Sequence, residues 1–293
     1  MMAERIYFVD TAIPADKKKR KKEKTHVVFD GKRLFKVSKL TELDDADEVY
    51  VDALFPAIYE EVIELIKKGI KIYLLRDTGL LEKLRIENGL EKSDEIDARL
   101  LRMIPKNRFK QLTLKEVTLL KLIEEYERYV KWRKIIRRWK QIRSLNSFEE
   151  CIRELRSLCE HHARKIIREV KSDEKYGTIY RLACDAIGIK DSVDVAILIV
   201  RLPLNWKLRR LKGLLGLTPH KCKSYHHRLR ANISKIAAII YLNNKRLNKT
   251  TSKAYEDITG LPCLKAIYML EIRILKALKR AWQQAQYMLA GEQ

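Results

Sequence analysis

Four aspartates in the first part of the chain are placed where their carboxylates could bind a metal ion together. Asp10 ends the apolar run RIYFVD, Asp52 lies within EVYVDALF, and Asp94 and Asp97 begin a segment with helical spacing. Residues three apart on a helix share a face, so the last two carboxylates point the same way. Oxygen ligands from neighbouring strand ends and a helix start are what Mg²⁺ needs in phosphoryl transfer. Each aspartate alone could be an ordinary turn or helix-start residue, but their joint placement favours a magnesium site.

A basic segment in the last third of the chain is the second group of candidates. Lysines and arginines alternate there with Tyr225, His226 and His227. Basic side chains contact phosphates and aromatic rings stack on bases, so this pattern favours nucleic-acid binding. A solvated helix face in a charge-rich protein is the alternative. The predicted nucleic-acid-binding residues are Lys221, Lys223, Tyr225, Arg228, Arg230 and Lys235.

Two short groups of histidine and cysteine leave zinc binding open as a weaker alternative. Neither group contains a CxxC pair or a second ligand pair at the spacing of a zinc finger. The five cysteines of the chain are an odd number at wide spacing, so we expect reduced thiols rather than a disulfide framework. The two groups are His220, Cys222, His226 and His227, and Cys159, His161 and His162.

The elements that would position the aspartates follow from the apolar periodicity of residues 1–104. Short apolar and β-branched runs, the second and third separated by an Asp-Gly turn, predict strands. A helical pattern between two apolar runs predicts a βαβ unit, and Ser93 is the predicted N-cap of a helix. We therefore expect an α/β domain with a mixed sheet. Its predicted strands are 5–10, 25–31, 33–40, 48–55 and 70–75, and its predicted helices are 58–68 and 93–104.

Long charged helices are predicted after this domain. Residues 112–145 contain no Gly or Pro and repeat apolar positions three and four apart, and a second helical stretch covers residues 147–170. This pattern predicts a coiled-coil-like dimerisation arm and leaves open a purely structural scaffold. Trp132 and Trp139 are seven residues apart, so we interpret them as core or dimer-seam residues rather than as residues that stack on bases. The predicted organisation is an α/β N-terminal domain over 1–104, a helical arm over 105–176 and an all-α C-terminal domain over 177–293.

The charge of the chain divides between these parts. The 293 residues include 62 Lys and Arg against 39 Asp and Glu, a net charge of +23. Residues 1–104 contain 21 basic and 21 acidic residues, so the whole excess of positive charge lies in residues 105–293. Such an excess argues against a free-standing small-molecule enzyme and favours a polyanionic partner. The basic run from Lys17 to Lys24 could be a flexible phosphate-binding arm or a solvated loop.

No apolar run approaches the roughly 18 to 20 residues that cross a bilayer, and the N-terminal residues do not have the pattern of a signal peptide. We therefore expect a cytoplasmic, nucleoid-associated protein with no membrane partner.

The order of these motifs resembles a known family. KSDEIDARLL is similar to the K-[TS]-D-x-x-D-A signature of the DEDD transposases of insertion-sequence family one-ten, relatives of the Piv invertase. IYFVD and EVYVDALF stand where that family has the strands with its first two acids. GLTP, KSY and ISK resemble blocks of its C-terminal domain, which carries a serine, matched here by Ser224. The resemblance follows the order of the family over nearly the whole chain.

The resemblance implies a ribonuclease-H-like, RuvC-like N-terminal domain and a Mg²⁺-dependent DNA transposase or recombinase. Asp10, Asp52, Asp94 and Asp97 would bind magnesium, and Ser224 would attack a DNA phosphodiester and hold the strand end covalently. A serine hydroxyl is a weak nucleophile at neutral pH, so a metal ion or a general base has to activate it. The family also uses a structured guide RNA, and the predicted arm implies a homo-oligomer, a dimer or a tetramer.

Three positions depart from the family pattern. Asp52 stands where the family usually has the longer Glu, and Tyr225 follows Ser224 where the family usually has Gly. AIGI replaces a P-G-I-G-like turn. These departures leave open a second interpretation, a domesticated and catalytically inactive descendant that binds nucleic acid without recombining it.

Overall fold

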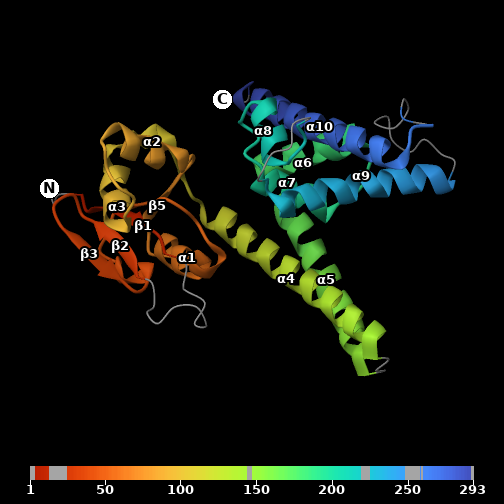
Figure 1. Cartoon of the computed structure of the whole chain (residues 1–293), viewed down its shortest axis with the longest axis horizontal. Helices are drawn as coiled ribbons and strands as arrows, with labels where there is room; N and C mark the ends of the chain where they lie inside the picture. Colours follow the sequence, from red (N-terminus) through yellow and green to blue (C-terminus); the bar gives the residue numbers. More distant parts are fainter. Residues whose placement is uncertain are drawn as a thin grey trace. The chain divides into compact units, whose positions relative to one another are not determined.

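The computed structural model contains a sheet-bearing unit and a helical unit (Figure 1). They are the two compact units into which the chain divides, residues 1–121 and 122–293. None of the helices in the described ranges combines the length and the hydropathy that crossing a bilayer requires. The structure describes residues 4–12, 25–143, 147–218, 225–247, 258 and 260–291.

The first unit is built on a mixed six-stranded sheet with the order β3-β2-β1-β4-β5-β6. The pairs β1–β4 and β4–β5 are parallel, and the pairs β1–β2, β2–β3 and β5–β6 are antiparallel. This confirms the mixed sheet that the periodicity predicts, with β6 as a further strand. The strands are β1 (Ile6–Asp10), β2 (His26–Phe29), β3 (Leu34–Val37), β4 (Glu48–Val51), β5 (Lys71–Leu75) and β6 (Phe109–Gln111).

Side-chain alternation along β4 divides the core of this unit between the two faces of the sheet. Val49 and Val51 belong to an apolar cluster that α1 closes, and Tyr50 belongs to a second cluster that α2 and α3 close. In the second cluster the rings of Tyr50 and Tyr73 stack, with centroids 4.8 Å apart. The helices of this unit are η1 (Leu40–Glu42), η2 (Pro56–Ile58), α1 (Tyr59–Lys67), α2 (Gly79–Glu87), α3 (Asp94–Met103) and η3 (Lys106–Arg108).

Two local signals fix the ends of the helices that flank the parallel strands. Gly69 follows α1 with a φ of 91°, a left-handed conformation that glycine adopts without the steric cost of a Cβ. The N–H of Ile70 then donates to the carbonyl of Leu65 at 3.1 Å, and β5 begins directly afterwards. Ser93 caps α3 as predicted, because its hydroxyl accepts the N–H of Ile96 at 3.1 Å.

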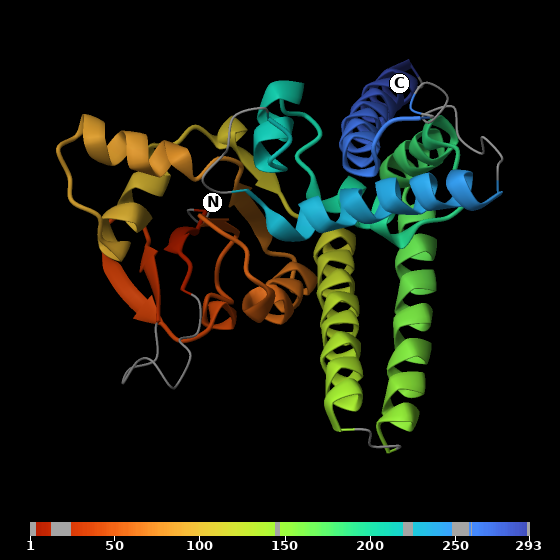
Figure 2. The same cartoon turned by 45° about the vertical axis from the view of Figure 1, so that its right-hand side comes forward.

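The second unit is helical, and α7 lies at its centre. The run from Val195 to Leu198 in α7 has no exposed surface. α5, α6 and α9 pack against α7, and α10 packs against α6 and α9. α4 begins in the first unit and continues into the second, where Figures 1 and 2 show it antiparallel beside α5. The helices are α4 (Leu114–Arg143), α5 (Ser147–Lys171), α6 (Glu174–Ile187), α7 (Val193–Arg201), α8 (Leu208–Leu214), α9 (His227–Leu247) and α10 (Cys263–Gly291).

Candidate functional site

Asp10 and Asp52 lie side by side at the ends of adjacent parallel strands. Asp10 is the last residue of β1, and Asp52 directly follows β4. Val9 pairs with Val51, and the N–H of Asp52 continues the ladder by donating to the carbonyl of Val9 at 3.3 Å. Alternation places both carboxylates on the face of the sheet that α3 covers. We call this end of the sheet, formed by the C-termini of β1 and β4, the acidic end.

Asp52 is a largely desolvated carboxylate whose orientation is fixed by Thr11. Its Oδ1 accepts the backbone N–H and the hydroxyl of Thr11, both at 2.8 Å. Burial raises the pKa of Asp52, and the hydrogen bonds from Thr11 oppose this rise. A cation bound beside a desolvated carboxylate stabilises its charged form, so a bound metal ion would oppose the rise in the pKa of Asp52.

The start of α3 lies at the acidic end as well. Lys36 of β3 lies level with Asp10 of β1, because both residues pair with the same residue of the intervening strand β2. Lys36 forms an ion pair with Glu95 of α3 at 3.0 Å. At the far end of the helix, Arg102 donates to a carbonyl of the β2–β3 turn at 2.8 Å. These two contacts fix the direction of α3 along the sheet. Asp94, in its first turn, therefore lies at the same end as Asp10.

Asp97, one turn further along α3, is paired with an arginine. Its side chain is 9% exposed, and that of Arg85 in α2 is 14% exposed. Nη1 of Arg85 contacts both carboxylate oxygens, with a distance of 2.6 Å to Oδ2. The charge of Asp97 is thus compensated within the fold. This carboxylate could reach a metal ion only after its ion pair with Arg85 is broken.

The donor set at the acidic end fits a magnesium ion held by two carboxylates. Mg²⁺ commonly takes one or two protein carboxylates and completes its shell with water and substrate phosphate oxygens. Asp10 and Asp52 supply two carboxylates on adjacent strands, and Asp94 starts the helix above them. Across the described ranges, no cluster of three or more His, Cys, Asp or Glu side chains could hold a metal ion. The fold therefore brings the first two predicted ligands together and gives Asp97 a different partner.

Part of the predicted nucleic-acid interface falls outside the described residues. Lys221, Lys223 and the predicted nucleophile Ser224 are not among them, and neither is the basic run at 17–24. Tyr225 is 38% exposed, and its ring lies beside that of His227 with the centroids 4.2 Å apart. Tyr225 lies just before α9 and His227 is its first residue. The same helix carries the remaining predicted nucleic-acid-binding residues, Arg228, Arg230 and Lys235.

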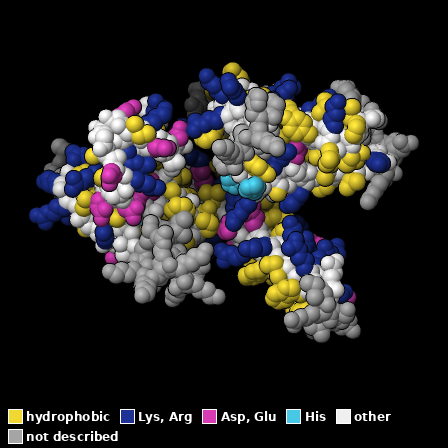
Figure 3. Space-filling view, viewed as in Figure 1, with side chains coloured by type: hydrophobic (Ala, Val, Ile, Leu, Met, Phe, Trp, Pro, Cys, Tyr) yellow, Lys and Arg dark blue, Asp and Glu magenta, His cyan; other side chains and the backbone are white. Residues whose placement is uncertain are grey.

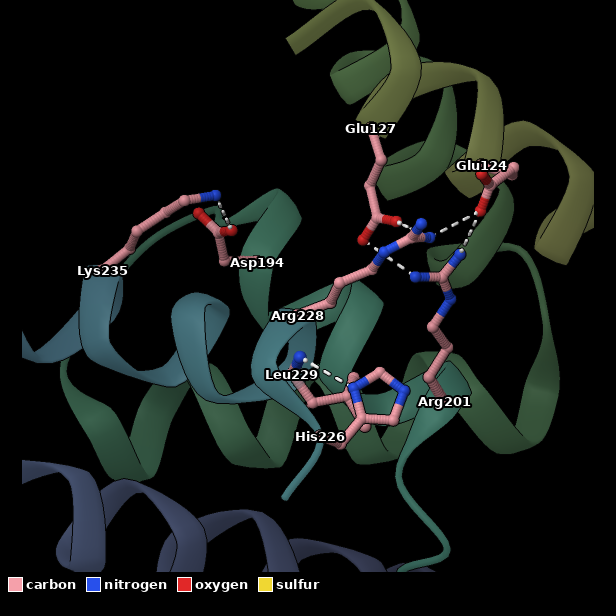
Figure 4. A network of polar contacts seen from close by, with 8 residues as sticks. All are labelled: Glu124, Glu127, Asp194, Arg201, His226, Arg228, Leu229 and Lys235. Atoms are coloured by element: carbon pink, nitrogen blue, oxygen red, sulfur yellow. Dashed lines mark hydrogen bonds and ion pairs between the residues drawn. The ribbon is translucent and has the colours of Figure 1, made fainter. Parts of the chain in front are cut away.

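Arg228 belongs to an ion-pair network of four residues (Figure 4). Its Nη1 lies 3.1 Å from Glu124 and 3.4 Å from Glu127. Arg201 of α7 contacts the same glutamates, at 3.4 Å and 2.8 Å respectively. The side chains of Arg201, Glu124 and Glu127 are 13%, 14% and 18% exposed, so the network ties α4, α7 and α9 together. Arg228 itself keeps 61% of its side chain exposed, and a phosphate could still reach it.

Arg230 and Lys235 also have carboxylate partners. Arg230 donates to Glu271 of α10 at 2.6 Å and to two backbone carbonyls, and the side chain of Glu271 is 3% exposed. Lys235 donates to Asp194 of α7 at 2.9 Å (Figure 4). These cations hold α9 to its neighbours. The described cations of the predicted interface therefore serve the internal structure of the helical unit.

His226 caps the start of α9. Its Nδ1 accepts the N–H of Leu229 at 3.3 Å. Burial lowers the pKa of His226, so its ring is neutral near neutral pH, as an accepting Nδ1 requires. His226, one of the residues suggested as zinc ligands, therefore has a structural role as the cap of α9.

In the first group, His220 and Cys222 lie outside the described residues, whereas the group of Cys159, His161 and His162 is described and is not arranged as a zinc site. Burial raises the pKa of the Cys159 thiol, which disfavours the thiolate that zinc needs. His162 lies 3.0 Å from the carbonyl of Leu158 through Nδ1 and 3.6 Å from Glu125 through Nε2. Both of its ring nitrogens thus already have protein partners.

Two residues that orient the acids, Thr11 and Arg85, are not among the residues predicted from the sequence. Thr11 directly follows Asp10, so a hydroxyl next to a strand-end acid was a usable signal. Arg85 precedes Asp97 by 12 residues, and their contact depends on how α2 folds back on α3. No spacing rule predicts that contact.

Comparison with models of known protein families finds no match for the chain, and comparison with curated protein sequences finds none. The family resemblance therefore depends on the motifs that carry it and on the placement of their residues.

Proposed function

We propose that the chain is a Mg²⁺-dependent DNA transposase or recombinase that cleaves and transfers DNA strands. The observation that carries this proposal is the placement of Asp10 and Asp52 at adjacent ends of β1 and β4, with Asp94 at the same end. The sheet supports it, because an antiparallel meander of β1 to β3 joined to parallel strands β4 and β5 is expected of a ribonuclease-H-like, RuvC-like domain. The guide RNA enters the proposal through the family resemblance alone.

The residues of the acidic end have separate parts in this proposal. Asp10 and Asp52 would hold the metal ion, and Thr11 keeps the Asp52 carboxylate in one orientation. A bound magnesium ion would supply charge stabilisation for the phosphate oxygens of the DNA. Arg85 neutralises Asp97 and fixes α3 against α2, which holds Asp94 at the acidic end.

The helical unit would hold the nucleic acid. Residues 122–293 contain 36 Lys and Arg against 17 Asp and Glu, a net charge of +19. Neutralising several phosphates releases counterions and gives strong, salt-dependent binding. Ser224, from the same unit, would be the nucleophile that forms the covalent link to DNA.

The test is the formation of a covalent protein–DNA adduct. Purified protein is incubated with its cognate RNA and DNA ends in Mg²⁺, and adducts are separated by denaturing electrophoresis. We expect adducts for the wild type and for Asp44→Asn, and none for Ser224→Ala or Asp10→Asn. Asp44 is a matched control because it is an exposed carboxylate of the same unit. An undiminished adduct in Ser224→Ala would refute the assignment of the nucleophile.

A second candidate function is a non-catalytic nucleic-acid-binding protein of the same ancestry. The ion pair between Arg85 and Asp97 favours it, since it commits one acid of the predicted tetrad to the fold. This alternative predicts that the wild-type protein binds nucleic acid but forms no covalent adduct in the test above. It also predicts no strand cleavage with any divalent metal ion.

A further inference from the structure

The second half of α4 carries positive charge that the helical unit leaves largely uncompensated. Residues 128–143 contain eight Lys and Arg and no Asp or Glu. Among those whose side chains the structure describes, Lys140 has an ion pair, to Glu149 of α5. Arg228, Arg230 and Lys235 of α9, by contrast, each have a carboxylate partner. The eight basic residues are Arg128, Lys131, Arg133, Lys134, Arg137, Arg138, Lys140 and Arg143.

Two tryptophans are exposed on the same stretch of helix. Trp132 is 47% exposed and Trp139 is 54% exposed, so they are not core residues of this chain. The ring of Trp132 meets that of Tyr129 edge-on with centroids 5.8 Å apart, and Trp139 lies 6.4 Å from the ring of Phe148 in α5. Each indole is supported on one side by an aromatic neighbour and presents much of its remaining surface to solvent.

Both indoles and several cations share one side of α4. A helix turns by about 100° and rises about 1.5 Å per residue, so residues seven apart differ by about 20° and about 10 Å. The same arithmetic places Arg128 within about 40° of both indoles and Lys131 and Arg138 about 80° to 120° further round the helix. All three cations are turned away from Tyr129 and Lys140, which contact α5. We call these five residues the Trp face. Figure 3 shows hydrophobic and basic side chains next to one another on the α4–α5 hairpin.

The composition of the Trp face fits an unpaired nucleic-acid strand better than a second copy of the same face. Two such faces in contact would bring like charges closer than the screening length of about 8 Å at physiological salt. A single strand offers opposite charge together with flat bases that stack on aromatic rings. The indoles are about 10 Å apart along the helix, far enough to take two separate bases.

We infer that the Trp face of α4 binds unpaired nucleotides, stacking bases on Trp132 and Trp139 and pairing phosphates with Arg128, Lys131 and Arg138. This inference rests on the nucleic-acid partner of the proposed function and does not depend on strand cleavage. It adds a contact surface separate from the predicted residues of α9.

The experiment measures binding of the full-length protein to fluorescein-labelled 20-nucleotide single strands of DNA and RNA and to a duplex of equal length, by fluorescence anisotropy. The variants are Trp132→Ala with Trp139→Ala, and Trp132→Phe with Trp139→Phe. Tyr287→Ala is the matched control, because Tyr287 is an aromatic side chain of α10 that is 80% exposed. Circular dichroism checks that each variant keeps its helices.

We expect the alanine pair to weaken single-strand binding by roughly tenfold for each tryptophan, because one stacked base contributes about that much. The phenylalanine pair should restore most of this affinity, and the Tyr287→Ala variant should bind like the wild type. Duplex binding should change much less. Reversing the charge of Arg138 should lower the salt dependence of single-strand binding by about one phosphate contact.

Unchanged single-strand affinity in the folded alanine pair would overturn the inference. The same holds if the alanine pair instead dissociates an oligomer in sedimentation while binding nucleic acid normally, since the face would then be an interface between copies. Asp10→Asn, which tests cleavage, should bind the strands like the wild type. Failure of the proposed catalysis and failure of this binding face are therefore separate results.

Discussion

Replacing Arg85 by methionine would leave the carboxylate of Asp97 buried without its cation. The two side chains are 14% and 9% exposed, so both charges are largely removed from water. At an effective dielectric constant near 20, unit charges about 4 Å apart interact by about 4 kcal/mol. Breaking a buried pair costs about 3 to 5 kcal/mol, and the N-terminal turn of α3 returns up to about 1 kcal/mol to the remaining anion. We therefore expect Arg85→Met to destabilise the first unit by about 3 kcal/mol.

Amide hydrogen exchange in residues 94–103 is the suitable assay. The four tryptophans all lie beyond residue 121, so their fluorescence reports on the second unit. Lys36→Met is the control, because it removes the exposed ion pair to Glu95 on the same helix and should change the exchange little. Exchange in Arg85→Met as slow as in the wild type would refute the reasoning. If Mg²⁺ slows amide exchange more in Arg85→Met than in the wild type, the freed carboxylate of Asp97 takes part in binding the metal ion.

Three further predictions concern titration and buried charge. Folding raises the pKa of Asp52, so the folded state is favoured by the protonated Asp52 carboxyl in acid. This contribution to the free energy of unfolding is lost as the pH rises through the folded-state pKa. Asp52→Asn should therefore melt higher than the wild type at neutral pH without Mg²⁺, and no higher in acid. Burial lowers the pKa of His226, so stability falls as the pH drops below the usual histidine pKa. His226→Asn should flatten this acid loss in urea unfolding followed by tryptophan fluorescence. Arg230→Met leaves Glu271 buried without its cation and should lower the free energy of unfolding by about 3 kcal/mol in the same urea assay. A decrease below about 1 kcal/mol would contradict a stabilising role of this ion pair.

The sheet and its acids could be predicted because they depend on local patterns. Alternating β-branched residues and a tight turn determine the first strands, and a helix that ends just before Gly69 leads to the parallel strand β5. Once β1 and β4 are parallel neighbours, Asp10 and Asp52 must lie together. β6 could not be predicted, because it is a strand of three residues that forms by pairing with β5.

The roles of the basic residues could be predicted only in part. The sequence shows the cations of α9, but the carboxylates that neutralise them are distant in the chain. Arg228 pairs with Glu124 across 104 residues, and Arg230 pairs with Glu271 across 41. The spacing of Trp132 and Trp139 likewise shows that they share a face. Whether that face is covered depends on the packing of α5.

The most direct test of the central claim is the binding of Mg²⁺ at the acidic end, measured by isothermal titration calorimetry. The wild type and Asp44→Asn should bind Mg²⁺ with the same affinity. Asp10→Asn and Asp52→Asn should each lose most of that affinity, because either change removes one of the two adjacent carboxylates. Equal binding by all four proteins would contradict the assignment of the acidic end as a metal site.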